Sequence, residues 1–275
     1  MSYSLANPVS GIHSKQPWFV LNADYFLTHI ELNHPLISHY YSFKPSDLVN
    51  GAVAIPDGCV DIIFDCDSVN PSAQVCGTRV EAQMVELNHH HQYFGIRFLP
   101  GIFPDFIQLS PSELIHSQYD LLEVTEGLEY LMWDIVEAST FQGRVQIANE
   151  FIKGKASHYS SITGALVERI CLKKGCIQVK ELEQYSGYTT RTLQRMFLKD
   201  VGLSPKGFCR AIRCQSAVYE INHQNKIVFS DLAFNLGFSD QSHFLREFKK
   251  QVNATPLDYL TQVKDVKYLS RLQCL

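Results

Sequence analysis

Arginine and glutamine side chains gather at two places in the second half of this 275-residue sequence. An arginine can donate two hydrogen bonds to O6 and N7 of guanine, and a glutamine amide can bond adenine in the same paired way. Each such contact discriminates between bases by roughly 1–3 kcal/mol. These types and spacings predict two surfaces that read the bases of double-stranded DNA. The residues concerned are Thr190, Arg191, Gln194 and Arg195 in the first place and Gln241, Ser242, His243 and Arg246 in the second.

The charge of the chain is distributed unevenly. Residues 160–275 carry a balance of +7, whereas residues 1–159 carry −11, which together give the net charge of −4. A basic module joined to an acidic one indicates that only the basic module meets a polyanion. Lys249 and Lys250 suit phosphate oxygens, which provide affinity and register but no base preference. The alternative is that these polar residues are the solvated faces of an ordinary helical bundle.

Local sequence features predict how the two polar sets are positioned. A helix-turn-helix unit needs a packed first helix, a permissive turn and a second helix with polar residues outward. In the first copy Gly187 supplies the turn, Thr189 is the expected N-cap, and Leu193 and Phe197 point inward. In the second copy the same parts are Gly237, Ser239, Phe244 and Phe248. The glycines are 50 residues apart and the last aromatic residues 51, so the second copy has one extra residue at its helix start.

The region from about residue 161 to 268 resembles the DNA-binding domain of the AraC/XylS family of bacterial transcriptional regulators. The segment GFSDQSHFLREFKK from Gly237, with Thr255-Pro256 and Tyr259 after it, is close to that family's second helix-turn-helix signature. Arg195-Met196-Phe197 and Gly202-Leu203-Ser204-Pro205 fit its first. The resemblance implies two three-helix subdomains joined by a helix over about 205–223, with both recognition helices on one side of the domain. Glu183 departs from the pattern, because the family usually carries a small alanine there.

The first half of the chain is predicted to be mainly β-strand. Short apolar runs at 52–55, 59–64 and 92–99 are separated by turn residues such as Pro56-Asp57-Gly58. Two helices follow, over 121–138 and around 145–152. This half resembles a cupin-like sensor domain. We therefore expect an α+β protein of two domains: a cupin-like β-barrel with helices over residues 1–157, and an all-α double helix-turn-helix domain over 161–268, with 154–161 as the linker.

Several charged residues of the first half are candidates for an effector pocket, since burial of charge is costly without a partner. The strand at 92–99 places Tyr93, Gly95, Arg97 and Leu99 on one face, so Arg97 sits among apolar neighbours. A bound anion would satisfy it. Turn hydrogen bonds and ion pairs at the barrel rim are the alternative, and Arg97 paired with Asp61 without an adjoining cavity would be structural. The candidate effector residues are Asp57, Asp61, Arg79, Tyr93 and Arg97.

Other classes of function are weaker. The histidine run at 89–91 is expected to be a solvated loop, since neighbouring strand residues point to opposite faces and no H-x-H ligand pair is present. Cys59 lies near Asp61 without a base positioned beside it, so no enzyme activity, metal or cofactor is predicted. The eight cysteines form no C-x-x-C pair and suit reduced thiols. No membrane segment or secretory signal is visible, which indicates a cytoplasmic protein.

Together these features predict a homodimeric transcriptional regulator that binds double-stranded DNA. We expect an activator that works with RNA polymerase and is controlled by a small-molecule effector in the N-terminal domain. The rival hypothesis is an effector-independent regulator whose N-terminal domain only dimerises or contacts a protein. The helices over 121–153 are expected to carry self-association. At least one of their two apolar stripes must cover the barrel, and the remaining stripe, with Leu131 as an exposed position, is available for a partner helix. The stripe residues include Leu128, Leu131, Met132 and Ile135.

Overall fold

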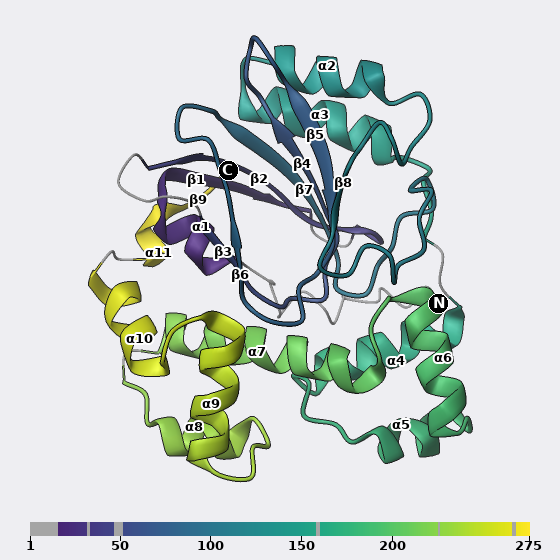
Figure 1. The fold of residues 1–275 in the computed structure, drawn as a ribbon, viewed down its shortest axis with the longest axis vertical. Coiled ribbons are helices and arrows are strands. Elements are labelled where there is room, and N and C mark those ends of the chain that lie inside the picture. Colours follow the sequence, from purple (N-terminus) through teal and green to yellow (C-terminus); the bar gives the residue numbers. More distant parts are fainter. Residues whose placement is uncertain (1–15, 32–33, 47–51, 158–159, 225, 266–267) are drawn as a thin grey trace, which may run out of the picture.

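The computed structural model describes residues 16–31, 34–46, 52–157, 160–224, 226–265 and 268–275. Residues 1–15, where no secretory signal was recognised, and residues 158 and 159 of the expected linker lie outside the described residues. The predicted order of a strand-rich N-terminal domain followed by an all-helical domain with two helix-turn-helix units is confirmed (Figure 1). The domain limits and the cupin-like assignment stay predictions.

Most strands of the N-terminal domain form one seven-stranded sheet. In spatial order these strands are β8 (Gln118–Asp120), β5 (Ser72–Cys76), β4 (Asp61–Asp65), β7 (Tyr93–Phe98), β2 (Ile37–Pro45), β1 (Ala23–Ile30) and β9 (Leu272–Cys274). Pairing is antiparallel throughout except between β1 and β9, which run parallel. A separate pair consists of β3 (Ala52–Ala54) and β6 (Gln83–Val85).

The two faces of this sheet pack against different partners. Phe94, Ile96 and Phe98 of β7 belong to a core shared with α2 (Glu129–Glu137) and α3 (Phe141–Ile152), which lie together on one side of the sheet (Figure 1). The opposite face carries Tyr93 and Arg97, each of which lines a hollow there, as the alternation in the sequence predicted. Gly95 is required on that face, because a Cβ there would lie 2.1 Å from the ring of Tyr41.

The first of the two predicted helices is shorter than expected. Residues 121–127 form turns and bends, and Gly127 takes a φ of +69°, a left-handed conformation that interrupts a helix. The apolar stripe of this segment is also placed differently from the prediction. Leu128, Leu131, Met132 and Ile135 are all buried against the sheet, so they are unavailable to a partner subunit. An apolar stripe indicates that one face of a helix is buried, but it does not show whether the sheet or a second subunit buries that face.

The C-terminal half is built around one long helix, α7 (Pro205–His223), whose bounds match the prediction. It contacts both recognition helices, α6 (Thr190–Asp200) and α9 (Gln241–Val252). The remaining helices complete the two units and the C-terminal end: α4 (Ser161–Leu172), α5 (Val179–Ser186), α8 (Phe229–Asn235), α10 (Pro256–Asp265) and α11 (Tyr268–Arg271). Within the described residues, no helix is long and apolar enough to cross a membrane.

The second helix-turn-helix unit shares its core with the N-terminal domain. Phe244 and Phe248 of α9 belong to the same buried cluster as Phe26 and Phe43 of the sheet and as helix α1 (Pro17–Leu21). After α11 the chain returns to the sheet as β9, beside β1. Arg271 anchors this return, because its Nη1 donates to the carbonyls of Leu21 and Ala23 at 3.0 and 2.7 Å. The two domains are therefore joined by a continuous apolar core.

Candidate nucleic-acid interface and buried pocket

The first recognition helix, α6, is set by a cap and two buried side chains. The hydroxyl of Thr189 accepts a hydrogen bond from the backbone N–H of Thr192, which confirms Thr189 as the N-cap. Leu193 and Phe197, four residues apart, are fully buried in the core of the first unit. The opposite side of α6 is exposed and carries Arg191, Gln194 and Arg195. Within the described residues, none of these three side chains has a recorded hydrogen bond or ion pair.

Glu183 accepts two hydrogen bonds at the start of α6. The backbone N–H and the hydroxyl of Thr190 both donate to Oε1 of Glu183, the hydroxyl at 2.7 Å. These bonds, the hydroxyl's first, hold the pKa of Glu183 below its usual value. Glu183 is the residue that departs from the family pattern, and its departure gives the recognition helix an extra acceptor at its N-terminus. Since the hydroxyl of Thr190 already has this partner, it would have to share that bond or break it to contact DNA.

The second recognition helix, α9, begins one residue later than the sequence suggested. Its N-cap is Asp240, whose Oδ1 accepts from the backbone N–H of His243 at 2.7 Å. Ser239, the expected cap, instead donates to Oδ2 of Asp240 at 3.0 Å and lies 3.1 Å from Nδ1 of His243. Both residue types cap helices, and the extra residue after Gly237 shifts the cap position. The backbone N–H of His243, three residues after Asp240, donates to Asp240, and this bond identifies Asp240 as the cap.

The exposed side of α9 resembles that of α6. Gln241, Ser242 and Arg246 are exposed, and Phe244 and Phe248 are buried. His243 is half-buried, with its ring edge-on to Phe238 at a centroid distance of 5.4 Å. The arrangement leaves two exposed, polar helix faces of similar composition at the two helix-turn-helix units.

The two lysines at the end of α9, Lys249 and Lys250, differ in their contacts with the N-terminal domain. Lys249 is exposed and has no recorded ion pair among the described residues. Lys250 forms an ion pair with Glu81 of the N-terminal domain at 2.7 Å, and its backbone carbonyl accepts from the N–H of Ala82 at 3.3 Å. Lys250 therefore contacts the loop that follows β5. Sequence reasoning missed this contact, because nothing local links residues 81 and 250.

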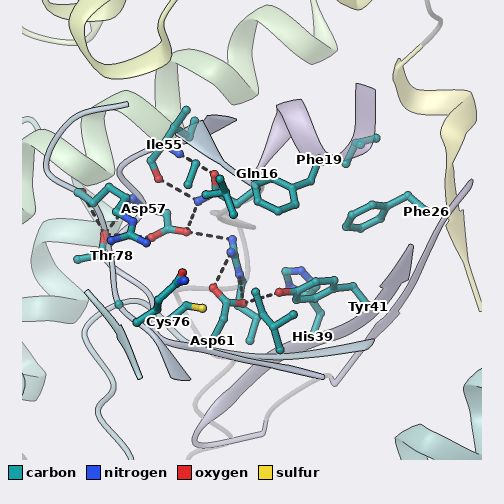
Figure 2. Close-up of a pocket in the computed structure, with 18 of the residues that line it drawn as sticks. Gln16, Phe19, Phe26, His39, Tyr41, Ile55, Asp57, Asp61, Cys76 and Thr78 are labelled. Carbon is teal, nitrogen blue, oxygen red and sulfur yellow. Dashed lines mark hydrogen bonds and ion pairs between the residues drawn. The ribbon is translucent and has the colours of Figure 1, made fainter. Parts of the chain in front are cut away.

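Four of the five candidate effector residues meet in the interior, and three of them form an ion cluster. Arg97 donates through Nε and Nη2 to the two carboxylate oxygens of Asp61 at 2.9 and 2.7 Å, and its Nη1 lies 3.1 Å from Oδ2 of Asp57 (Figure 2). Tyr41 donates to Asp61 at 3.1 Å, and Gln16 donates to Asp57 at 2.6 Å. Burial opposes the charge on Arg97, yet the two carboxylates hold the pKa of its guanidinium well above the usual value.

A cavity of about 60 Å³ adjoins this cluster. Its walls come from the sheet, from helix α1 and from the segment after β5, and they are mainly apolar. Arg97 is therefore ion-paired, as the structural alternative predicted, and it also lies beside a cavity, as the ligand hypothesis required. The lining residues include Phe19, Val20, Phe26, Ile55, Ile63 and Val85 together with Asp57, Asp61, Arg79 and Arg97.

A second, wider hollow of about 630 Å³ lies next to the first, between β5 and β6. The two share six lining residues: Phe19, Ile63, Cys76, Arg79, Val85 and Gln118. Tyr93, the fifth candidate, lines the wider hollow, where its hydroxyl accepts from the backbone N–H of Asn88 at 2.9 Å. Arg79 is buried, and its Nη1 has no hydrogen-bond partner within the described residues.

The histidine run at 89–91 and Cys59 were the residues behind the metal-site and enzyme alternatives. His89 and His90 lie in a turn, and Nδ1 of His91 lies 2.8 Å from Oδ2 of Asp65. No group of three or more potential ligands is arranged to hold a metal ion among the described residues. Cys59 is buried, and its thiol donates to the backbone carbonyl of Asp57 at 3.7 Å.

Comparisons with known proteins agree with this architecture. Residues 182–262 match a family model described as a helix-turn-helix domain, which covers both units. Over 76 residues the chain is 34% identical to the HTH-type transcriptional activator RhaS of Escherichia coli (strain SE11), covering 28% of this chain. Residues 182–262 thus form a helix-turn-helix domain of the AraC type, as the sequence predicted. The match spans only 27% of the length of RhaS. Residues 31–120 match a model described as a domain of unknown function, DUF6597.

Two solved structures resemble parts or most of the chain at low sequence identity. The C-terminal domain of AraT, a response regulator from Geobacillus stearothermophilus, is 20% identical with a TM-score of 0.36, covering 38% of this chain and 88% of that one. ToxT from Vibrio cholerae is 11% identical with a TM-score of 0.42, covering 88% of this chain and 95% of that one.

Proposed function

We propose that this protein is an AraC-type, sequence-specific regulator of transcription that binds double-stranded DNA through α6 and α9. The observation that carries the proposal is the pair of helix-turn-helix units with matching exposed faces, at opposite ends of α7 (Figure 1). Arginine and glutamine on these faces have the chemistry to read bases. The balance of +7 in this half supplies attraction to phosphates.

The side chains are proposed to divide into two roles. Arg195 and Arg246 are proposed to read one base pair each in separate half-elements, with Gln194 and Gln241 beside them. The other polar residues of the two faces, Thr190, Arg191, Ser242 and His243, contribute neighbouring contacts. Lys249 is proposed to contact phosphate, because it is exposed and unpaired within the described residues. Lys250 would have to exchange Glu81 for a phosphate, and this surface ion pair is weak enough for that exchange.

We further propose that the protein is an activator controlled by a small-molecule effector in the N-terminal domain. Two segments run from the cavity to α9. Helix α1 lines the cavity with Phe19 and Val20, and Trp18 of the same helix donates from Nε1 to the carbonyl of Val252. The segment after β5 lines the cavity with Arg79 and reaches Lys250 with Glu81. A ligand that binds one arrangement of these segments better than another would shift the position of α9.

The remaining expectations are proposals as well: a homodimer, RNA polymerase as the protein partner, and a cytoplasmic location. An effector-independent regulator is the alternative, in which the N-terminal domain only dimerises or contacts a protein. The observation that favours it is the ion cluster, since Asp57 and Asp61 already satisfy Arg97 without a ligand. A regulator of this kind acts without enzyme chemistry.

DNA selection from a random library tests the central proposal, with the full chain because the second unit shares its core with the N-terminal domain. The selected duplex is then titrated by fluorescence anisotropy at several salt concentrations, and affinity should fall steeply as salt rises. Arg195→Ala and Arg246→Ala should each relax discrimination at one base position, by about 1–3 kcal/mol. Lys249→Ala is the matched control, and should weaken all sequences alike and flatten the salt slope by about one unit.

Two outcomes would contradict this proposal. If selection enriched no sequence, the protein would not be a sequence-specific reader. If Arg195→Ala or Arg246→Ala weakened every duplex equally, that arginine would be a phosphate contact and its base-reading role would be wrong.

A further inference from the structure

We propose that Arg79 is the anion-binding residue of a site for an organic monocarboxylate with an apolar body. The site spans the 60 Å³ cavity and the adjoining 630 Å³ hollow, because Arg79 lines both. The proposal deepens the proposed function, on which its regulatory consequence rests, by naming the chemical class of the effector. The binding site itself can be tested without DNA.

Arg79 differs from the other arginine of the cavity in how its charge is satisfied. Arg97 is held by two carboxylates, whereas Arg79 is only 6% exposed and its Nη1 has no hydrogen-bond partner in the described part of the chain. No ion pair of Arg79 is recorded there either. A buried charged donor without a partner costs free energy, and such groups call for a specific explanation. An anion in the adjoining space would provide the missing acceptor.

The surroundings of Arg79 indicate the type of anion. The residues shared by both hollows include Phe19, Ile63 and Val85, so the body of the ligand would lie against apolar side chains. A carboxylate matches the planar guanidinium and can accept two hydrogen bonds from it. Asp57 and Asp61 line the same cavity, and Glu86 and Asp65 line the hollow. These carboxylates repel a dianion more than a monoanion, which favours a monocarboxylate over a phosphate monoester.

A ligand at Arg79 would lie close to the contact between the N-terminal domain and α9. Arg79 precedes Glu81 by two residues and Ala82 by three, and these two residues make the ion pair and the backbone hydrogen bond to Lys250. Ordering Arg79 around an anion would thus constrain the segment that touches the last turn of the second recognition helix. This places the ligand where its binding can alter DNA affinity.

Isothermal titration of the full chain with matched pairs of ligands tests the site. The probes are benzoate, cyclohexanecarboxylate and octanoate, each beside its primary amide, which has nearly the same shape without the charge. At least one acid should bind wild-type protein about tenfold or more tightly than its amide, because a charge-assisted hydrogen bond in a buried site is strong. Arg79→Gln should remove this preference, and Arg79→Lys should retain part of it.

Arg144→Gln is the matched control variant. Arg144 is also buried with an Nη1 that has no hydrogen-bond partner among the described residues, but it lies on α3 and lines neither hollow. Its substitution should leave the preference for acids intact. Circular dichroism establishes that each variant is folded, and if Arg79→Gln fails to fold, Arg79→Lys carries the comparison through its weakened preference.

Three results would overturn the proposal: no acid bound by wild-type protein at millimolar concentration, an amide bound as tightly as its acid, or an unchanged preference in folded Arg79 variants. Failure of the proposed function looks different. If an acid binds through Arg79 and the protein selects no DNA, the carboxylate site stands and the role in transcription falls. If DNA is bound and no acid is, the role in transcription stands and the carboxylate site falls.

Discussion

The indole Nε1 of Trp18 donates a hydrogen bond of 2.8 Å to the backbone carbonyl of Val252, across 234 residues of sequence. Val252 is the last residue of recognition helix α9. The ring of Trp18 also meets Tyr259 edge-on at a centroid distance of 5.6 Å. Phe19 and Val20, the next residues of α1, line the cavity that holds the ion cluster. One turn of helix thus touches both the candidate ligand site and the candidate DNA-reading helix.

Removal of this hydrogen bond should loosen the contact between the domains. Trp18→Phe leaves a buried carbonyl without its donor, so the free energy of unfolding should fall by about 1–3 kcal/mol. Urea denaturation followed by far-ultraviolet circular dichroism measures it. The only other tryptophan, Trp133, is 47% exposed, and Trp133→Phe should change the free energy of unfolding by less than about 0.5 kcal/mol. Equal effects of the two substitutions would show that the Trp18 contact adds no stability.

A glycine at the domain boundary offers a second test. Gly58 has a φ of +72°, and a Cβ there would lie 2.7 Å from the ring of Phe208 on α7. Gly127 has a similar φ of +69° but open space around it. Gly127→Ala should lose about 1–2 kcal/mol from the left-handed backbone alone. Gly58→Ala should lose about 1–3 kcal/mol more through overpacking against Phe208. If both variants lost the same free energy of unfolding, the approach of Phe208 would not constrain residue 58.

The cap of α9 should make stability depend on pH in acid. The backbone N–H of His243 and the hydroxyl of Ser239 hold the pKa of Asp240 below the ordinary value of 3.8. The contribution of this carboxylate to stability is therefore fully present above pH 3.8 and is lost as the pH falls through the lowered pKa. Asp240→Ala should lower the melting temperature at neutral pH, and its difference from wild type should shrink below pH 3.8.

Asp240→Asn provides the control for that measurement, because an asparagine caps a helix without titrating in this range. Its advantage over Asp240→Ala should persist into acid. A wild-type advantage over Asp240→Ala that did not change with pH would contradict the assigned cap.

Self-association can be tested on α2, where the buried and exposed sides are distinct. Tyr130 is 82% exposed, while its neighbour Leu131 is buried against the sheet. Leu131→Glu should unfold the N-terminal domain, because it buries an unpaired carboxylate. Tyr130→Glu should leave the fold unchanged and convert a dimer to a monomer if the outer face of α2 forms the interface. Analytical ultracentrifugation decides between these outcomes, and wild-type protein that sediments as a monomer at micromolar concentration would end the dimer proposal.

The sequence alone predicted those features whose causes are local. The turn glycines, the Thr189 cap and the inward pair Leu193 and Phe197 are a few residues apart, so the helix-turn-helix units could be recognised from spacing. The long helix over 205–223 was implied by the family resemblance, and the alternation in 93–98 predicted that Tyr93 and Arg97 share one side of the strand. Residue chemistry also marked Asp57, Asp61, Arg79, Tyr93 and Arg97, all of which line a hollow.

Only the tertiary structure decided which distant groups meet. Arg97 and its two carboxylates come from separate strands and turns. The sequence could mark Asp57, Asp61, Arg79 and Arg97 as candidates, but it could not show that both carboxylates pair with Arg97 or that Nη1 of Arg79 lacks a hydrogen-bond partner among the described residues. The burial of Leu131 against the sheet and the contact of Trp18 with Val252 could not be predicted from the sequence for the same reason. A side chain's type states what kind of partner it needs, whereas the identity of that partner depends on how separate segments pack.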